Sequence, residues 1–207
     1  MQMARAADRD ALLGRALRLE YLTIGWMAVE AAAGIGIGVA ARSAALVAFA
    51  LDSVVEMASG AVLIWRLRAE GAGRSVEDVE RKAIRGVAIA YLSLAGYVAV
   101  HALVDLVTDF HPESSRAGIV LAVVALVAMP GLAWRKRIVA RELDSRSMLG
   151  DAKQALLCAS LSAVLLVGLV VRARLGLWWA DPVAAIGIAA LAAREGYEMW
   201  TTEDICC

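Results

Sequence analysis

The run AALVAFALDSVVEMASGAVLIW, residues 44–65, is apolar along most of its length and carries two acidic residues, Asp52 and Glu56. Its length matches the roughly 20 residues that an α-helix needs to cross the ~30 Å hydrocarbon core of a bilayer. Lipid offers no partners to backbone N–H and C=O groups, so a crossing segment must satisfy them within a helix. The run therefore predicts a transmembrane helix that holds two carboxyl groups at membrane depth.

Five more apolar runs of similar length occur along the chain. They cover residues 17–40, 86–108, 117–134, 149–171 and 178–200. The chain of 207 residues is 61% hydrophobic, whereas a soluble domain carries roughly 45–50% apolar residues. We therefore expect an all-α membrane protein, a six-transmembrane-helix bundle that forms a single transmembrane domain over residues 1–207.

Basic residues gather on one side of this predicted bundle. The N-terminal segment and the connections after the second and fourth runs hold most of the Lys and Arg residues, among them Arg135, Lys136 and Arg137. The connections on the other side hold only Arg42, Arg116, Arg172 and Arg174. The positive-inside rule then places both termini in the cytosol, and we expect a multi-pass protein of the plasma (inner) membrane. No basic patch with interleaved aromatic residues occurs, which argues against nucleic acid as a partner.

Asp52 and Glu56 are four residues apart and therefore share one helix face, with Cβ atoms roughly 5–6 Å apart. Two adjacent carboxylates in a low dielectric repel each other and resist ionisation. Either they share protons, as in a hydrogen bond between helices, or a cation lies between them. Acidic residues at membrane depth are costly and usually functional, which favours the cation.

The fifth run holds Asp151, Gln154 and Cys158, and the last two are again four residues apart. The second and fifth runs cross in opposite directions, so Glu56 and Cys158 should lie at nearly the same depth. Taken alone, Gln154 is more simply a hydrogen-bonding residue between helices and Cys158 a small buried hydrophobe. Together with Asp52 and Glu56, they make a four-ligand site for a borderline metal such as Zn2+, with Cd2+, Mn2+ and Fe2+ as alternatives.

Other polar residues in the apolar runs have weaker assignments. Glu30 should lie near the depth of Asp52, and we expect it, like Asp151, to support the ligands or couple protons rather than bind the metal directly. His101 and Asp105 are also four residues apart, and a hydrogen-bonded pair is favoured over a second metal site. Asp181 precedes Pro182 and is expected to cap the sixth helix rather than bind metal.

The three cysteines have no regular spacing and do not form a disulfide framework. Cys206 and Cys207 end the chain as vicinal thiols. Such thiols can pass on a soft metal or be acylated, but the absence of any role is favoured for this pair.

Three of these motifs together resemble those of the cation diffusion facilitator (cation efflux) family. Residues 50–56, ALDSVVE, are similar to the D-S-x-x-D of the family's second helix. Residues 150–158, GDAKQALLC, are similar to the A-D-x-x-H-x-x-x-D of its fifth helix, and residues 180–182, ADP, to the D-P that opens its sixth. The resemblance covers the whole chain and implies six spans with both termini inside.

The departures from the family pattern concern the ligands. Gln154 stands where the family has histidine, Cys158 where it has aspartate, and Glu56 where it has a second aspartate. The chain resembles a short branch of the family without the cytosolic C-terminal domain. The family implies a homodimer that exports zinc or a similar divalent cation by metal/proton antiport, and not an enzyme. The alternative is a non-transporting metal-binding sensor or interaction protein on the same fold.

Overall fold

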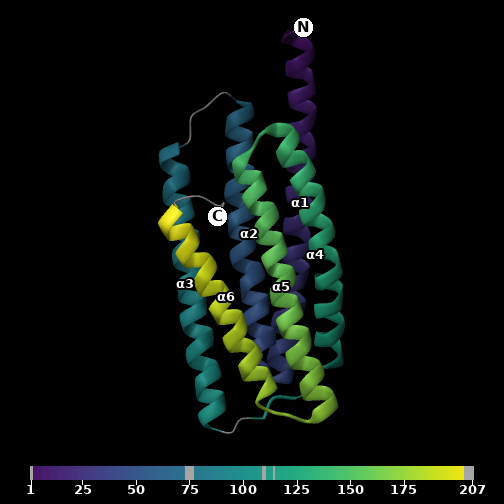
Figure 1. Ribbon diagram of the computed structural model, residues 1–207, viewed down its shortest axis with the longest axis vertical. Helices are drawn as coiled ribbons and strands as arrows, with labels where there is room; N and C mark the ends of the chain where they lie inside the picture. The colour runs from purple at the N-terminus through teal and green to yellow at the C-terminus, as the bar shows by residue number, and fades with distance from the viewer. Residues whose placement is uncertain (1, 73–76, 109–110, 114, 203–207) are drawn as a thin grey trace.

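The computed structural model describes residues 2–72, 77–108, 111–113 and 115–202. Within these residues the chain forms six α-helices and no strand, which confirms the predicted all-α fold. The helices are α1 (Gln2–Ala41), α2 (Ala44–Gly71), α3 (Glu77–Val107), α4 (Arg116–Leu143), α5 (Arg146–Leu175) and α6 (Ala180–Thr202). Successive helices run in opposite directions along a common long axis (Figure 1).

Five of the described helices, α1 to α5, contain segments long and apolar enough to cross a membrane. These segments are Ala11–Ala41, Ala44–Ala69, Ile84–Val107, Arg116–Leu143 and Ser147–Leu175. The remaining helix, α6, carries Arg194, Glu195 and Glu198 in its second half and is not among them. Its 23 residues nevertheless span about 35 Å at 1.5 Å per residue. It lies along α3 within the same bundle (Figure 1).

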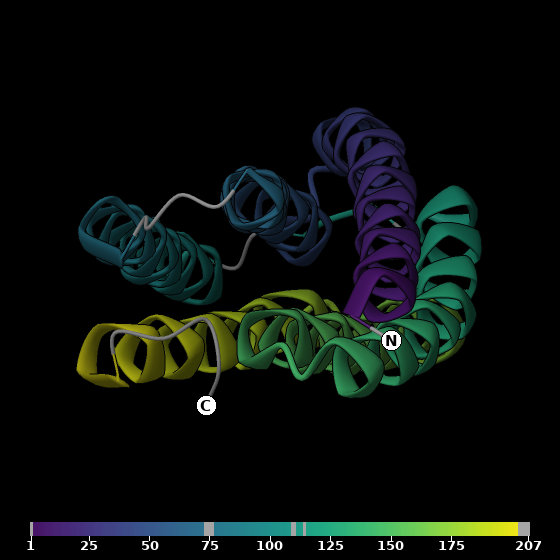
Figure 2. The same cartoon turned by 90° about the horizontal axis from the view of Figure 1, so that it is seen from above.

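The helix that carries Asp52 and Glu56 is central in the bundle. The most extensive packing joins α4 to α5, α1 to α2 and α3 to α6, and α2 also contacts α3, α5 and α6. Seen from above, α2 lies between α3 on one side and α1 on the other, with α5 and α6 along its third side (Figure 2). The carboxyl groups of Asp52 and Glu56 are therefore surrounded by protein rather than by lipid.

Small side chains let these helices approach closely, as in other membrane bundles. The main apolar core joins large residues of α2 and α5 to a row of alanines on α4. It includes Leu46, Phe49, Leu165 and Leu169 together with Ala122, Ala125, Met129 and Ala133. The alanine row follows the helical period, so one face of α4 is smooth enough to lie against its neighbours.

The connection predicted between the fourth and fifth runs is much shorter in the structure. α4 continues from the predicted end at Trp134 to Leu143, and only Asp144 and Ser145 separate it from α5. Asp144 ends α4 in the left-handed region at φ 52°, and the Ser145 hydroxyl accepts a hydrogen bond from the Met148 N–H to cap α5. The extension is helical because it has an apolar face, which packs in a second cluster formed by Leu13, Ala16, Leu63, Leu67, Val139, Ala140, Leu143 and Met148.

We predicted that Asp181 caps the N-terminus of its own helix, and this was wrong, because its carboxylate binds groups at the start of another helix. Asp181 lies inside the first turn of α6, and its carboxylate accepts hydrogen bonds from the Ser43 hydroxyl and, at 3.3 Å, from the Ala45 N–H. Ser43 immediately precedes α2, and Ala45 lies in its first turn, where free backbone N–H groups need partners. The carboxylate thus ties the start of α6 to the start of α2, which sequence-local capping rules do not anticipate.

The side of the membrane on which the termini lie stays a prediction from the Lys and Arg distribution. We expect a reporter fused to the C-terminus to read as cytosolic, because the arginine-rich ends of the helices stay on that side. A reporter inserted after Gly176, between α5 and α6, should read as external and serves as the control. The opposite result for both fusions would contradict the assignment.

Gly168 provides a test of the α5–α6 contact. A Cβ atom at this position would lie 2.5 Å from the Ala184 Cβ and 3.2 Å from the Ala180 carbonyl oxygen. We expect Gly168→Ala to lower stability by about 1–3 kcal/mol, because overpacking forces the helices apart. The measurement is thermal unfolding in detergent. The control is Gly96→Ala, whose new Cβ meets nothing within 4 Å. Equal midpoints for the two variants would contradict the close contact.

Candidate metal centre

Asp52, Glu56 and Cys158 converge where α2 meets α5. One potential ligand atom from each residue lies within 4.8 Å of the other two. All three side chains are buried, with exposed fractions of 2%, 5% and 2%. Ligand atoms bonded to one ion at about 2.0–2.3 Å lie at most about 4.6 Å apart, so side chains this close need little movement to share an ion. Among the described residues, no other group of three His, Cys, Asp or Glu side chains lies so close together.

A small cavity of about 10 Å³ lies at this convergence. Its polar lining consists of Asp52, Glu56, Tyr91, Gln154, Cys158 and Glu195. This volume is close to that of one water-sized sphere, whereas pockets for organic ligands are roughly 300–1,000 Å³. The space therefore fits a single ion and excludes an organic substrate of ordinary size.

Gln154 is positioned by two hydrogen bonds to other helices. Its Oε1 accepts from the Ser59 hydroxyl at 3.1 Å, and its Nε2 donates to the Tyr91 hydroxyl at 2.6 Å. Gln154 therefore forms hydrogen bonds between helices, which was the simpler of the two interpretations of its sequence position. It also lines the cavity. An amide oxygen has two acceptor positions, so the bond from Ser59 leaves one of them for a cation. Ligation by Gln154 stays a prediction.

Glu30 lies beside Cys158 with both carboxylate oxygens engaged. Oε1 accepts from the Ser53 hydroxyl at 2.6 Å and faces the Cys158 Sγ at 3.9 Å, and Oε2 accepts from the Trp26 Nε1 at 2.9 Å. Its side chain is fully buried. Because both oxygens have partners on α1 or α2, this geometry favours a supporting role over direct ligation, although that role stays a prediction.

Asp151 has a partner that the sequence interpretation did not identify. Its carboxylate forms an ion pair with Lys136, whose Nζ also lies 3.0 Å from the Glu20 Oε2. Lys136 was counted among the basic residues of a surface connection, and this was wrong, because only 1% of the side chain is exposed. The signal was available in the sequence, since Lys136 shares its helix face with Ala133, Val139 and Ala140.

Two residues that line the cavity were missed altogether, Tyr91 on α3 and Glu195 on α6. Neither has a second potential ligand four residues away in its helix, so the spacing that marks the other pairs does not mark it. Glu195 lies near the end of its helix, where a charged residue is usually solvated. Only the approach of α3 and α6 to α2 brings both side chains to the cavity.

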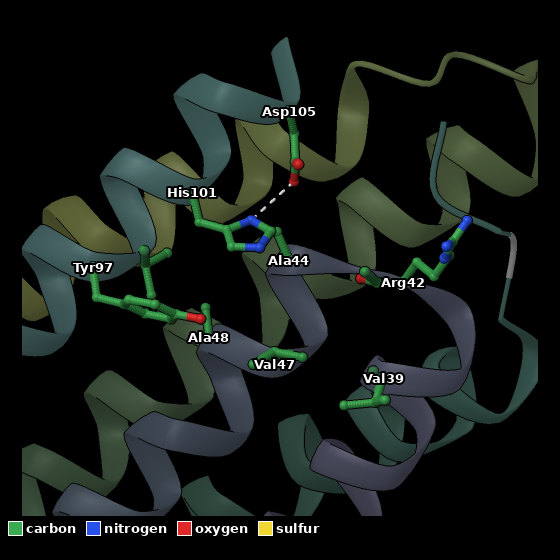
Figure 3. Close-up of a pocket in the computed structure, with 11 residues that line it drawn as sticks. Val39, Arg42, Ala44, Val47, Ala48, Tyr97, His101 and Asp105 are labelled. Carbon is green, nitrogen blue, oxygen red and sulfur yellow. Dashed lines mark hydrogen bonds and ion pairs between the residues drawn. The ribbon is translucent and has the colours of Figure 1, made fainter. Parts of the chain in front are cut away.

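His101 and Asp105 line a separate, larger cavity of about 400 Å³ between α1, α2 and α3. Figure 3 shows the two side chains pointing toward each other, with Arg42 at the other end of the cavity. The His101 Nδ1 lies 3.1 Å from the Asp105 Oδ2, and half of the histidine side chain is exposed. The described residues supply no third ligand there, which matches the favoured hydrogen-bonded pair. Cys206 and Cys207 lie outside the described residues.

The helical bundle, its apolar segments and its buried group of acid and thiol side chains define a multi-pass membrane protein with the features of a cation carrier. Residues 81–202 match the profile of the cation efflux transmembrane domain. Since this match covers more than half of the chain, the protein belongs to the cation efflux family and is a metal cation transporter. No curated protein matches the chain. Gln154 and Cys158 lie within the matched segment, whereas Asp52 and Glu56 precede it.

Proposed function

We propose that the protein exports zinc or a similar divalent cation in exchange for protons, through a centre formed by Asp52, Glu56, Gln154 and Cys158. The observation that carries this proposal is the convergence of two carboxyl groups and a thiol, all buried, within 4.8 Å of one another. Buried acid groups are costly in a membrane unless a cation or protons compensate them. A carrier that binds a cation in one state and protons in the other compensates the buried acid groups in both states.

The donor types favour zinc. Carboxylate oxygen and thiolate sulfur are both common zinc ligands, and an amide oxygen completes a four-coordinate set. The Glu56 Oε2 is buried without a hydrogen-bond partner, so it is free to bind an ion. The thiolate makes Cd2+ a close competitor and makes Mn2+ and Fe2+ weaker ones.

Proton coupling follows from the same ligands. Carboxylates and thiols must lose their protons to bind a metal, so cation binding releases protons and falls as the pH falls. Protons arriving from the opposite side then compete the cation off the centre. Glu30 and Asp151 lie close enough to interact electrostatically with Glu56, and they provide further acid groups for this exchange.

The seam between α5 and α6 provides a route to the centre. Glu195, Leu157 and Leu191 line both the small central cavity and a larger, more open one of about 250 Å³. The larger cavity is also lined by Lys153, Ser160, Arg194 and Glu198. We propose that a cation passes Glu195 on its way to or from Asp52, guided by the carboxylate that both cavities share.

The family resemblance also implies a homodimer, which we propose forms within the plasma (inner) membrane. α3 offers an apolar outward surface to lipid or to a second copy, with Tyr97, Val100, Leu103, Val104 and Val107 all more than half exposed. Cross-linking in native membranes should trap the dimer, because an association of helices persists in the bilayer.

Flux measurements with purified protein in liposomes test the proposed function. A zinc-sensitive dye inside one set of vesicles and a pH-sensitive dye inside another should report Zn2+ uptake and opposite proton movement above the rate of protein-free vesicles. An imposed proton gradient, acidic inside, should accelerate the uptake. Zinc binding without any flux would contradict transport and favour the alternative, a metal-binding sensor or interaction protein.

A further inference from the structure

Lys136 is a buried cation held between two buried carboxylates. Its Nζ lies 3.0 Å from the Glu20 Oε2 and pairs with the Asp151 Oδ2, and each of the three side chains is at most 4% exposed. The three residues come from different helices, α4, α1 and α5. Truncating one partner of such a buried pair is strongly destabilising, because it leaves an uncompensated charge.

The ammonium group does not satisfy all the polar groups around it. Glu20 Oε1 is buried without a hydrogen-bond partner, although Oε2 of the same carboxylate pairs with Lys136. Two further side-chain atoms of the described residues are buried without a partner, Glu56 Oε2 in the proposed metal centre and the Ser147 hydroxyl on α5. An unpartnered buried oxygen is costly, so Glu20 Oε1 indicates that this pair of carboxylates can bind a cation that makes more bonds to them than the ammonium does.

This cluster is separate from the proposed metal centre and lies toward the end of the bundle where the chain begins. Glu20 precedes Glu30 by about 15 Å along α1, and Asp151 precedes Cys158 by about 10 Å along α5, at 1.5 Å per residue. A Cβ atom added to Gly60 on α2 would lie 3.9 Å from the Glu20 Oε2, so Glu20 reaches α2 one turn beyond Glu56. The charges of Asp151 and Lys136 interact with the Glu56 carboxylate.

We propose that Glu20 and Asp151 form a second cation-binding site, in which the Lys136 ammonium is the resident cation and which a hard divalent ion occupies when that ammonium moves away. The donors are all oxygen, as Mg2+ and Mn2+ prefer, and no thiol is among them. A lysine ammonium is a point charge on a flexible stem, and in this proposal it leaves the two carboxylates when the ion binds. Its two ligands, Glu20 and Asp151, are not among the four proposed ligands of the centre at Asp52 and Cys158.

Removing the ammonium should expose the site to an external ion. We expect purified Lys136→Met, a variant of similar length without charge, to bind one more Mn2+ per chain than the wild type. Elemental analysis after equilibrium dialysis against MnCl2 measures the stoichiometry. The double variant Lys136→Met/Glu20→Gln should return to the wild-type value, and Cd2+ should replace the additional Mn2+ poorly. The additional Mn2+ should persist in an Asp52→Asn background, which separates this site from the proposed centre.

The same variants give a stability readout. Lys136→Met leaves two carboxylates without a counter-ion, so its thermal midpoint should be low in a chelator and should rise with Mn2+ concentration. Lys136→Gln, which retains two hydrogen-bond donors, serves as a second neutral variant. Folded variants with no additional Mn2+, or an additional Mn2+ that survives Glu20→Gln, would overturn the proposal. Failure of both neutral variants to fold in Mn2+-supplemented cells would also overturn it, because an ion able to replace the ammonium rescues them.

Discussion

Asp52→Asn should reduce zinc affinity by more than about 100-fold, because even residues that only support metal ligands typically contribute 10–100-fold. The change keeps the size of the side chain but removes its negative charge. That charge matters in this buried setting, where Asp52 is 2% exposed and α2 is surrounded by other helices. Zinc flux in liposomes should fall with binding, since a carrier moves only the cation that it binds.

Titration calorimetry at several pH values checks this first prediction. Wild-type affinity should fall as the pH falls, because protons compete for the carboxylates and the thiol, and this dependence should be weaker in Asp52→Asn. The matched control is Asp144→Asn, the same change at an exposed position after α4, where asparagine also tolerates the left-handed backbone. Full zinc affinity in Asp52→Asn would show that the centre lies elsewhere.

Cys158→Asp should change which cations bind rather than whether a cation binds. Aspartate restores the residue type that the family motif has at this position and replaces a soft sulfur ligand by a hard oxygen. We expect the preference for Cd2+ over Mn2+ to fall by at least about tenfold, equivalent to ~1.4 kcal/mol. Zinc binding should persist, since zinc accepts both oxygen and sulfur ligands.

Competition calorimetry with Zn2+, Cd2+ and Mn2+ measures this second effect. Cys158→Ala is the control, because it removes the ligand without supplying another and should weaken all three cations, Cd2+ most of all. If Cys158→Asp leaves the order of affinities unchanged, Cys158 is a packing residue. Its position in the main apolar core, beside Ala155, Ala159 and Leu161, is compatible with that alternative and makes the measurement decisive.

The oxygen-only cluster around Lys136 and the thiol-containing centre differ in chemistry, and this difference separates the two proposals experimentally. The centre at Asp52 and Cys158 should favour soft and borderline cations, whereas Glu20 and Asp151 should favour hard ones. The Lys136 cluster and the centre at Asp52 and Cys158 are both buried between helices of the bundle. If the termini are cytosolic, the Lys136 cluster lies between the cytosol and the centre.

The sequence alone determined the helices and the residue pairs within them. Apolar run length predicts a membrane helix, and a spacing of four places Asp52 beside Glu56, Gln154 beside Cys158 and His101 beside Asp105. These relations are local because they depend only on the geometry of one helix. The depth match between Glu56 and Cys158 also followed from sequence, since antiparallel helices of known length have a calculable register.

Contacts between helices were decided only by the tertiary structure. The burial of Lys136, the approach of Tyr91 and Glu195 to the central cavity, and the hydrogen bonds of Asp181 with the start of α2 all depend on which helix faces which. A transmembrane helix is apolar on most of its faces, so its sequence does not indicate which face meets which neighbour. Small residues such as Gly168 set these lateral contacts through the fit of two surfaces. The fit depends on both helices, so it cannot be predicted from the sequence of either helix alone.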